Sequence, residues 1–213
     1  MGYWITVEGV DGSGKSSQVP RLVAHLVAAG HQVVTTKEPG GTKFGLAIRA
    51  VVLGEEGQGL SARAQLMLFE ADRMATVRDV VAPGLSAGSW VVSDRGPFGS
   101  SVYQGHMGGI PLAEVEELTL IATGGRWPDL AVVLDLPVEE SMRRIANRPN
   151  GGNWLDKKGE AWVRGVRAAY QAIAAAHSER VALMSAIGTE EEVAERVWSC
   201  VSERLLKGTK RSR

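Results

Sequence analysis

Short apolar runs rich in β-branched or aromatic residues alternate along the chain with longer stretches in which apolar residues recur at helical spacing. This alternation is typical of a parallel β-sheet covered by helices on both faces, so we expect an α/β fold. The strands are predicted at residues 3–8, 31–37, 90–94, 130–136 and 181–184. The helices are predicted at residues 16–29, 44–53, 62–80, 112–122 and 190–206. The last helix should begin with a capping box, because Thr189 is followed three residues later by Glu192.

Residues 147–153 break this pattern, because they combine one proline, two glycines and three asparagines. Such a composition favours a loop, and loops of this kind often serve as lids in phosphotransferases. We expect a lid at about residues 146–158 within a single domain over residues 1–207. Residues 208–213 are expected to form a basic, flexible tail.

Size and composition narrow the class of protein. The chain of 213 residues is long enough for one well-buried core and too short for two full domains. Its 24 basic and 24 acidic residues balance, which argues against nucleic acid as a partner. The single cysteine, Cys200, can form no internal disulfide, and the first residues lead into a strand without a signal sequence. No apolar run approaches the roughly 20 residues that span a membrane, so we expect a cytoplasmic protein without a membrane segment.

The sequence GVDGSGKS at residues 9–16 matches the phosphate-loop pattern G-x-x-x-x-G-K-[ST], after a predicted strand and at the start of a predicted helix. Glycines allow backbone N–H groups to surround a phosphate, the helix start adds partial positive charge, and Lys15 can reach the β and γ oxygens. Ser16 is the expected Mg²⁺ ligand. The residues expected to bind ATP here are Gly9, Asp11, Gly12, Ser13, Gly14, Lys15, Ser16 and Ser17.

Asp94 ends a predicted apolar strand, where an aspartate can orient Mg²⁺ and its waters. Asp135, near the end of the strand predicted at 130–136, is a rival for this role. Arg95 favours Asp94, because a metal-orienting acid beside a phosphate-binding base suits transfer between two phosphates. The guanine-reading N-K-x-D sequence is absent, so a kinase is favoured over a switch GTPase.

Five stretches of the chain occur together, in this order and at similar spacing, in one enzyme family. They are residues 7–16 (VEGVDGSGKS), 38–42 (EPGGT), 68–73 (LFEADR), 93–95 with 102–105 (SDR and VYQG), and 128–130 with 134–136 (PDL and LDL). On these motifs the chain resembles thymidylate kinases, which are P-loop nucleoside monophosphate kinases, over about residues 3–200.

The resemblance implies a three-layer P-loop NTPase fold with a five-stranded parallel sheet in the order 2-3-1-4-5. It also implies transfer of the γ-phosphoryl group of ATP to dTMP, giving dTDP and ADP for dTTP synthesis. ATP and Mg²⁺ are the ligands implied on the donor side. A homodimer formed through helices including residues 62–80 is implied as well.

The resemblance assigns roles to residues at matching positions in the acceptor site. Phe69 is similar to the aromatic residue that stacks on the pyrimidine, the alternative being a core residue of its helix. Arg73 is similar to the base that donates to O4 of the ring, the alternative being a solvated helix face. Ser100 would contact N3, and Tyr103 would close against the sugar and disfavour a 2′-hydroxyl.

Further roles follow from the same resemblance. Asp11 would accept a hydrogen bond from the 3′-hydroxyl, and Arg95 would hold the monophosphate. Glu38 and Pro39 would shape the acceptor pocket through backbone geometry. Gln104 matches in identity, with a helix-surface role as the alternative.

Because the acceptor phosphate is already ionised at neutral pH, no general base is needed and catalysis should rest on positioning and on cations. In the family that the chain resembles, an arginine sits either in the phosphate loop or in the lid, so the resemblance together with Gly12 in the loop implies a lid arginine. However, the usual D-R-[aromatic]-E lid motif is missing, and the aligned residues 153–158 read NWLDKK. The catalytic residues would be Lys15, Arg95 and, as first candidate for the lid cation, Arg148. Lys157 and Lys158 are the alternatives for the lid.

Three other positions concern the ligands. Arg144 resembles the residue that stacks on the donor adenine. Gly96 replaces the usual aromatic residue and Gly99 a common serine, which would leave room for a bulkier base. A kinase for another pyrimidine deoxynucleotide, such as a 5-modified deoxyuridylate, is therefore an alternative. The altered lid leaves a second alternative, a nucleotide-dependent switch or binding module without transferase activity.

Overall fold

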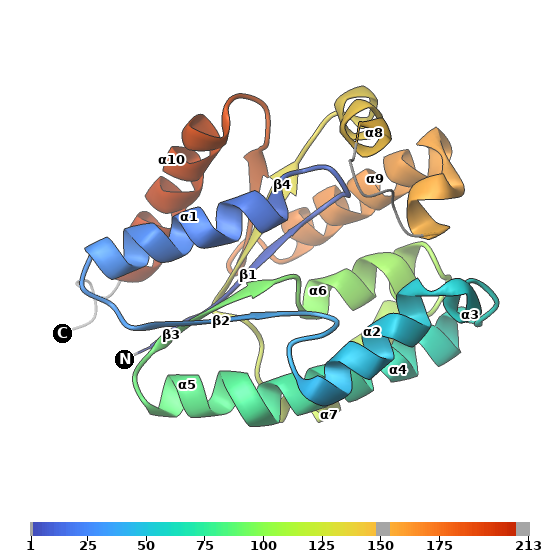
Figure 1. The fold of residues 1–213 in the computed structure, drawn as a ribbon, viewed down its shortest axis with the longest axis horizontal. Coiled ribbons are helices and arrows are strands. Elements are labelled where there is room, and N and C mark those ends of the chain that lie inside the picture. Colours follow the sequence, from blue (N-terminus) through green and yellow to red (C-terminus); the bar gives the residue numbers. More distant parts are fainter. Residues whose placement is uncertain (1, 148–153, 208–213) are drawn as a thin grey trace.

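The computed structural model describes residues 2–147 and 154–207, whose arrangement is shown in Figure 1. Five parallel strands form one sheet in the order β2-β3-β1-β4-β5. The strands are β1 (Trp4–Gly9), β2 (Val33–Lys37), β3 (Trp90–Asp94), β4 (Leu130–Asp135) and β5 (Val181–Ser185). The α/β fold and the strand order are therefore confirmed. The tail 208–213 and most of the expected lid loop, residues 148–153, lie outside the described residues.

Helices cover both sides of the sheet. In Figure 1, α1 and α10 lie above the sheet and pack against each other, whereas α2, α4, α5 and α7 lie below it. The helices are α1 (Lys15–Ala28), α2 (Lys43–Leu53), α3 (Glu55–Gln58), α4 (Ala62–Thr76), α5 (Ala82–Ser86), α6 (Pro97–Ser100), α7 (Leu112–Thr123), α8 (Val138–Ala146), α9 (Glu160–Ala176) and α10 (Glu190–Val201). Shorter helical segments of other types are Val77–Val81, Ser101–His106, Trp154–Lys158 and Ser202–Lys207.

The register of the sheet brings the motifs after β1 and β3 together. Val7 in β1 lies opposite Asp94 in β3, and Gly9 lies opposite Leu134 in β4. Because the strands are parallel, the turns that follow them leave the same carboxyl edge of the sheet, where α/β proteins bind their ligands. The loop at residues 9–16 therefore starts beside the Asp94-Arg95 pair.

The helix predicted at residues 62–80 is longer than expected. α4 continues through a π-helical segment, Val77–Val81, into α5 without leaving the helical path. Pro83 lies in the first turn of α5. The π-helical segment changes the hydrogen-bond register just before this proline, which a regular helix interior would not tolerate.

Residues 160–176 are not among the predicted helices, but they form the 17-residue helix α9 in the structure. Its buried residues Val163, Val166, Tyr170 and Ile173 recur at helical spacing, so the signal was present in the sequence. At α10 the prediction is confirmed, because Thr189 and Glu192 form the expected capping box.

The core lies between the sheet and its helices, and Trp4 and Trp90 are among its largest fully buried side chains. Trp4 belongs to β1 and Trp90 opens β3, so the central strands are anchored by tryptophans. None of the helices in the described ranges combines the length and the apolar character needed to cross a bilayer.

One buried residue of β1 is an acid, Glu8. Its Oε2 accepts a hydrogen bond of 3.1 Å from the hydroxyl of Tyr170 on α9. Its Oε1 has no hydrogen-bond partner among the described residues. Burial raises the pKa of Glu8 to about 7, although Arg95 and the Tyr170 hydroxyl lower it. The central strand therefore holds a carboxyl that is partly protonated near neutral pH.

Replacement of Glu8 by glutamine should make the protein more stable at neutral pH. The folded pKa of about 7 lies above the ordinary value of 4.5, so the folded protein keeps a proton that the unfolded chain releases. Wild-type stability is therefore lost as the pH rises between these values. Relative to wild type, the free energy of unfolding of Glu8→Gln should rise by about 3 kcal/mol across this window and level off above about pH 8. Urea unfolding at several pH values measures the difference.

The matched control is Glu203→Gln, which removes an exposed carboxyl from the segment Ser202–Lys207. Its stability difference from wild type should not depend on pH in this range. If the Glu8→Gln difference were equally flat, Glu8 would be ionised in the folded protein throughout, and the burial argument would be wrong.

Candidate active site

The turn between β1 and α1 has the backbone of an anion-binding loop. Gly9, Gly12 and Gly14 have φ angles of 137°, 80° and 92°, which lie in the left-handed region that favours glycine. A Cβ on Gly9 would stand 2.6 Å from the carbonyl oxygen of Leu134, so this position also needs the smallest residue. Gly14 is the N-cap of α1, and the unpaired N–H groups of the first turn of this helix can therefore bind an anion.

Lys15 lies inside this loop. Its buried ammonium donates to the carbonyl oxygens of Gly9 and Val10 at 3.0 and 2.9 Å, and it lies 3.9 Å from Asp11 Oδ1. Burial and the neighbouring charge of Arg95 lower the pKa of Lys15 to about 8. The loop thus satisfies the ammonium with its own carbonyl groups, and these bonds must be exchanged when the ammonium contacts a phosphate.

The two predicted metal ligands are in contact. The hydroxyl of Ser16 donates to Asp94 Oδ2 at 2.8 Å, and such hard oxygen atoms suit Mg²⁺. Within the described ranges, no group of three or more His, Cys, Asp or Glu side chains could hold a metal alone. Mg²⁺ is usually bound by one or two protein groups together with substrate phosphates, and Ser16 and Asp94 are two such groups. The rival acid, Asp135, instead forms a two-bond ion pair with Arg167 at 2.6 and 2.8 Å.

Arg95 connects the loop to α9. Its guanidinium pairs with Asp11 at 2.6 Å and donates to the hydroxyls of Tyr103 and Tyr170 at 3.3 Å each. It also lies 5.2 Å from the centre of the Tyr103 ring. Arg95 has a φ of 70°, which is unusual for a residue other than glycine and occurs often at functional sites. These contacts hold a cation directly beside the phosphate loop.

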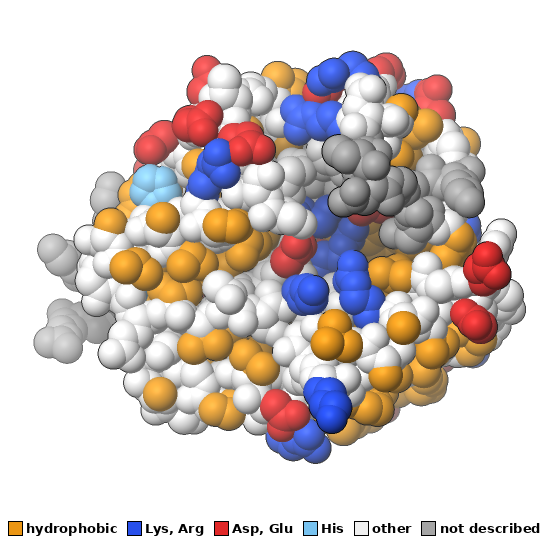
Figure 2. All heavy atoms as spheres, viewed as in Figure 1, with side chains coloured by type: hydrophobic (Ala, Val, Ile, Leu, Met, Phe, Trp, Pro, Cys, Tyr) orange, Lys and Arg blue, Asp and Glu red, His pale blue; other side chains and the backbone are white. Residues whose placement is uncertain are grey.

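A cavity of about 670 Å³ opens in front of the loop. In Figure 2, Lys and Arg side chains gather around a hollow on this face of the molecule. The predicted residues that line the cavity are Asp11, Gly12, Gly14, Lys15, Ser16, Ser17, Glu38, Pro39, Phe69, Arg73, Asp94, Arg95, Ser100, Tyr103 and Gln104. Gly9 does not line it. The structure thus brings nearly all of the expected loop and acceptor-site residues around one space.

Arg73 forms part of the wall of this cavity and is only 2% exposed. It donates to Glu38 at 2.9 Å, forms an ion pair with Glu70, and contacts the hydroxyl of Ser100 at 3.2 Å. Burial raises the pKa of Glu38 to about 7, against the opposing effect of Arg73. The alternative of a solvated helix face is wrong for Arg73, because protein groups surround its guanidinium.

The other predicted acceptor residues also face the cavity. Phe69 is half-buried at its wall rather than part of the apolar core. Gln104 is buried and lines the cavity, so it is not a helix-surface residue. The carbonyl oxygen of Pro39 accepts a bond of 3.0 Å from Arg49, a lining residue that the motifs did not indicate.

Gly96 and Gly99 both line the large cavity, but a side chain at Gly96 would not fill it. A Cβ on Gly96 would meet Thr6 Cγ2 at 2.6 Å, so the missing side chain would point into the sheet and not into the cavity. The absence of a side chain instead allows the backbone after β3 to approach β1. At Gly99, a Cβ would have only Glu8 Oε2 nearby, at 3.8 Å.

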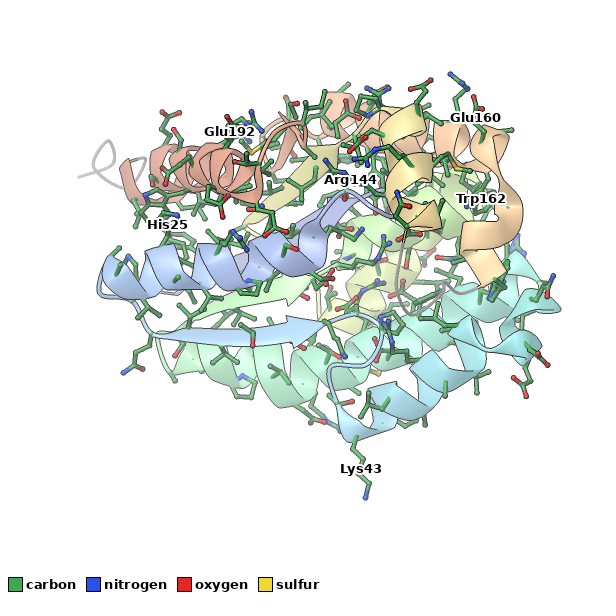
Figure 3. The ribbon with its side chains drawn as sticks, turned by 45° about the horizontal axis from the view of Figure 1, so that its top comes forward. His25, Lys43, Arg144, Glu160, Trp162 and Glu192 are labelled. Carbon is green, nitrogen blue, oxygen red and sulfur yellow. The ribbon has the colours of Figure 1, made fainter. Side chains whose placement is uncertain are left out.

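A second, smaller cavity of about 300 Å³ lies on the other side of the phosphate loop. Arg144 lines it and donates to the carbonyl oxygen of Gly12 at 3.3 Å; in Figure 3 its label marks α8 close to this loop. Ser13 and Ser17 also face this cavity. The rest of its wall includes Gly188 and Thr189 between β5 and α10, which sequence reasoning did not identify as site residues. The available signal was the position of this loop directly after a strand, at the carboxyl edge of the sheet where α/β proteins bind ligands.

The expected lid is described only in part. Arg148 and the side chain of Lys157 lie outside the described residues, whereas Lys158 lines the large cavity. Trp154 and Trp162 also line it, and sequence reasoning missed both as site residues. The available signal was the presence of two tryptophans on either side of a pair of lysines.

Comparison with known proteins agrees with this geometry. The family described as "Thymidylate kinase" matches residues 7–197. The chain is 38% identical to a thymidylate kinase of Solidesulfovibrio magneticus over 208 residues, covering 95% of this chain and all of that protein. It is 39% identical to one of Desulfosudis oleivorans, covering 91% of this chain and 94% of the relative. With one of a Synechococcus species the identity is 40%, over 95% of each chain.

The matched range contains both cavities and the loop between them, and the relatives are similar over almost their whole length. The chain therefore belongs to the thymidylate kinase family.

Proposed function

We propose that this chain transfers the γ-phosphoryl group of ATP to dTMP and releases dTDP and ADP, as a step toward dTTP. One observation carries the proposal: the phosphate loop separates two cavities and takes part in the walls of both, through Gly12, Gly14 and Ser17. Two nucleotides bound in these cavities would meet at the loop with their phosphates. Family membership supports the same reaction.

The smaller cavity fits the donor. ATP would place its phosphates against the N-terminus of α1 and its adenine beside Arg144, whose guanidinium can stack on a base. Lys15 would leave the carbonyl oxygens of Gly9 and Val10 to contact the β- and γ-phosphates. Ser16 and Asp94 would hold Mg²⁺, which supplies positive charge to the phosphates when bound.

The larger cavity fits the acceptor. The thymine ring would stack on Phe69, with Arg73 donating to O4 and the hydroxyl of Ser100 accepting from N3–H. Tyr103 would lie against the sugar, and Asp11 would accept a hydrogen bond from the 3′-hydroxyl. Glu38, Pro39 and Gln104 would complete the wall of this pocket. The inward-facing position of these side chains supports each assignment.

The reaction needs alignment and charge compensation rather than proton transfer. The attacking oxygen belongs to a phosphate that is ionised at neutral pH, so the chain supplies no general base. Arg95 is positioned by Asp11, Tyr103 and Tyr170 to hold the acceptor phosphate near the loop. Fixed cations around the transferring group lower the repulsion between donor and acceptor, and they can stabilise the charge of the transition state.

A coupled assay with ATP and a panel of monophosphates tests the proposal. Thymidylate should be the preferred acceptor, ahead of deoxyuridylate, 5-substituted deoxyuridylates, deoxycytidylate and the ribonucleotides. Lys15→Ala should lower kcat at least about 100-fold, because it removes a cation from the transferring phosphates. No transfer by the wild-type protein to any acceptor, or full activity of Lys15→Ala, would refute the proposal.

Phe69→Ala should raise the KM for thymidylate by about tenfold and leave kcat nearly unchanged, because the stacking contact is present both before and during the reaction. Phe69→Tyr keeps the ring and should stay close to wild type. Steady-state kinetics at saturating ATP measure both constants. A lowered melting temperature with an unchanged KM would place Phe69 among the packing residues instead.

We further propose that the protein is a homodimer. α4 packs between α2 and α7, and apolar side chains of these three helices remain exposed. They are Phe44, Leu46, Val51, Met67, Met74, Leu112, Leu120 and Ile121. A cluster of exposed apolar residues on adjacent helices is typical of a surface that another molecule covers. The family resemblance implied a dimer through helices including residues 62–80, the segment that begins with α4.

Met67→Glu should convert the dimer to a monomer in sedimentation velocity experiments at micromolar protein, because Met67, 53% exposed on α4, would place a charge in the interface. Val27→Glu is the matched control, since Val27 is 56% exposed on α1, away from these helices. A wild-type monomer, or a dimer that Met67→Glu does not weaken, would contradict the proposed interface.

A further inference from the structure

The described part of the lid holds a lysine between two tryptophan rings. The ammonium of Lys158 lies 3.9 Å from the centre of the Trp162 ring and 4.8 Å from that of Trp154. These distances are well inside the range in which a cation is attracted to the face of an indole. Gly159 follows Lys158 with a φ of 80°, and this glycine conformation turns the chain into α9. The three side chains form a clamp, which we call the tryptophan clamp.

The clamp is tied to the opposite wall of the large cavity. The indole N–H of Trp154 donates to the carbonyl oxygen of Val52 at 3.1 Å. Val52 lies in the last turn of α2, where helix carbonyl groups lack a partner within the helix. Trp154, Val52 and Lys158 all line the cavity. One hydrogen bond between residues 102 positions apart therefore fixes the lid segment across the acceptor side.

The clamp also reaches the residues around Arg95. The ring of Trp162, which Figure 3 labels at the start of α9, has its centre 6.5 Å from that of the Tyr103 ring. The guanidinium of Arg95 lies 5.2 Å from the centre of the same Tyr103 ring. A series of cation–ring and ring–ring contacts therefore runs from Lys158 through Trp162 and Tyr103 to Arg95 beside the phosphate loop. This series gives the ammonium of Lys158 a defined place relative to Arg95.

The partners of Lys158 leave its charge available. Among the side chains that the structure describes, no carboxylate lies within ion-pair distance of its ammonium. By contrast, Arg143 and Arg144 share the carboxylate of Glu140. A ring face attracts a cation without neutralising its charge, so an ammonium held in this way can still bind a phosphate.

We propose that Trp154 and Trp162 are positioning residues, which hold Lys158 at the cavity as the cation that the lid contributes to phosphoryl transfer. The inference rests on the proposed function and adds to it the means by which the lid is fixed. Trp154 has no charge of its own and acts through two contacts. Its N–H ties the lid to α2, and its ring orients Lys158.

A double-mutant cycle on kcat tests this arrangement. Lys158→Met and Trp154→Ala should each lower kcat by about 30-fold with little change in the KM for thymidylate, since both remove the same fixed cation. The double variant should be no slower than Lys158→Met alone, because Trp154 acts through Lys158. Lys158→Arg should recover most of the activity. Trp154→Phe keeps a ring but loses the N–H, and it should lower kcat by about threefold.

Two control variants match these changes. Lys43→Met removes an exposed lysine that points away from the protein at the start of α2 (Figure 3). Trp198→Phe changes a tryptophan of α10 that stacks on His25 of α1. Both should keep wild-type kinetics. Thermal unfolding of every variant shows whether the fold is retained, and Trp154→Phe keeps the test valid if Trp154→Ala unfolds.

Wild-type kcat in Lys158→Met would overturn the proposal, as would multiplied losses in the double variant. Either result can be distinguished from failure of the proposed function. If only the role of the clamp is wrong, the wild-type protein still phosphorylates thymidylate. If the proposed function is wrong, the wild-type protein does not phosphorylate thymidylate.

Discussion

The site depends on the parallel arrangement of β1 between β3 and β4. Because β1 and β3 are parallel neighbours, the glycine-rich turn after β1 and the Asp94-Arg95 pair at the end of β3 lie at the same edge of the sheet. A pair of nucleotides carries many negative charges, and bringing their phosphates together requires cations and N–H groups that are fixed before the ligands arrive. The sheet supplies that fixed geometry, and the rest of the site is built from its edge outward.

Four of the cations that line the large cavity, Lys15, Arg73, Arg95 and Lys158, are held in different ways. Two carboxylates fix Arg73, backbone carbonyl groups hold Lys15, and indole rings hold Lys158. Arg95 has an intermediate environment of one carboxylate and two tyrosine hydroxyls. The groups that bind each cation determine how easily it can move. A guanidinium between two carboxylates is held rigidly in the cavity wall. A cation on carbonyl groups or rings can exchange these contacts for those of a phosphate.

Much of this fold was accessible from the sequence, and the reasons are local. The phosphate loop, the five strands and the capping box at Thr189 each depend on residues that are close in the chain. The roles proposed for Phe69 and Arg73 depend on the family resemblance, since no spacing rule places these residues at a cavity. Gly96 shows the limit of both approaches, because only the packing of Thr6 reveals where a side chain would point. The tie between Trp154 and Val52 joins distant segments and left no local signal.

The tryptophan clamp has a spectroscopic consequence. Two of the six tryptophans in the chain line the large cavity beside the same ammonium, that of Lys158. Trp154 is also bonded to a carbonyl group, and Trp162 lies near a tyrosine ring. The emission of an indole responds to such neighbours and to water. The protein therefore carries an internal optical reporter at the large cavity, and the arrival of ligands there can be followed in real time without attaching a dye.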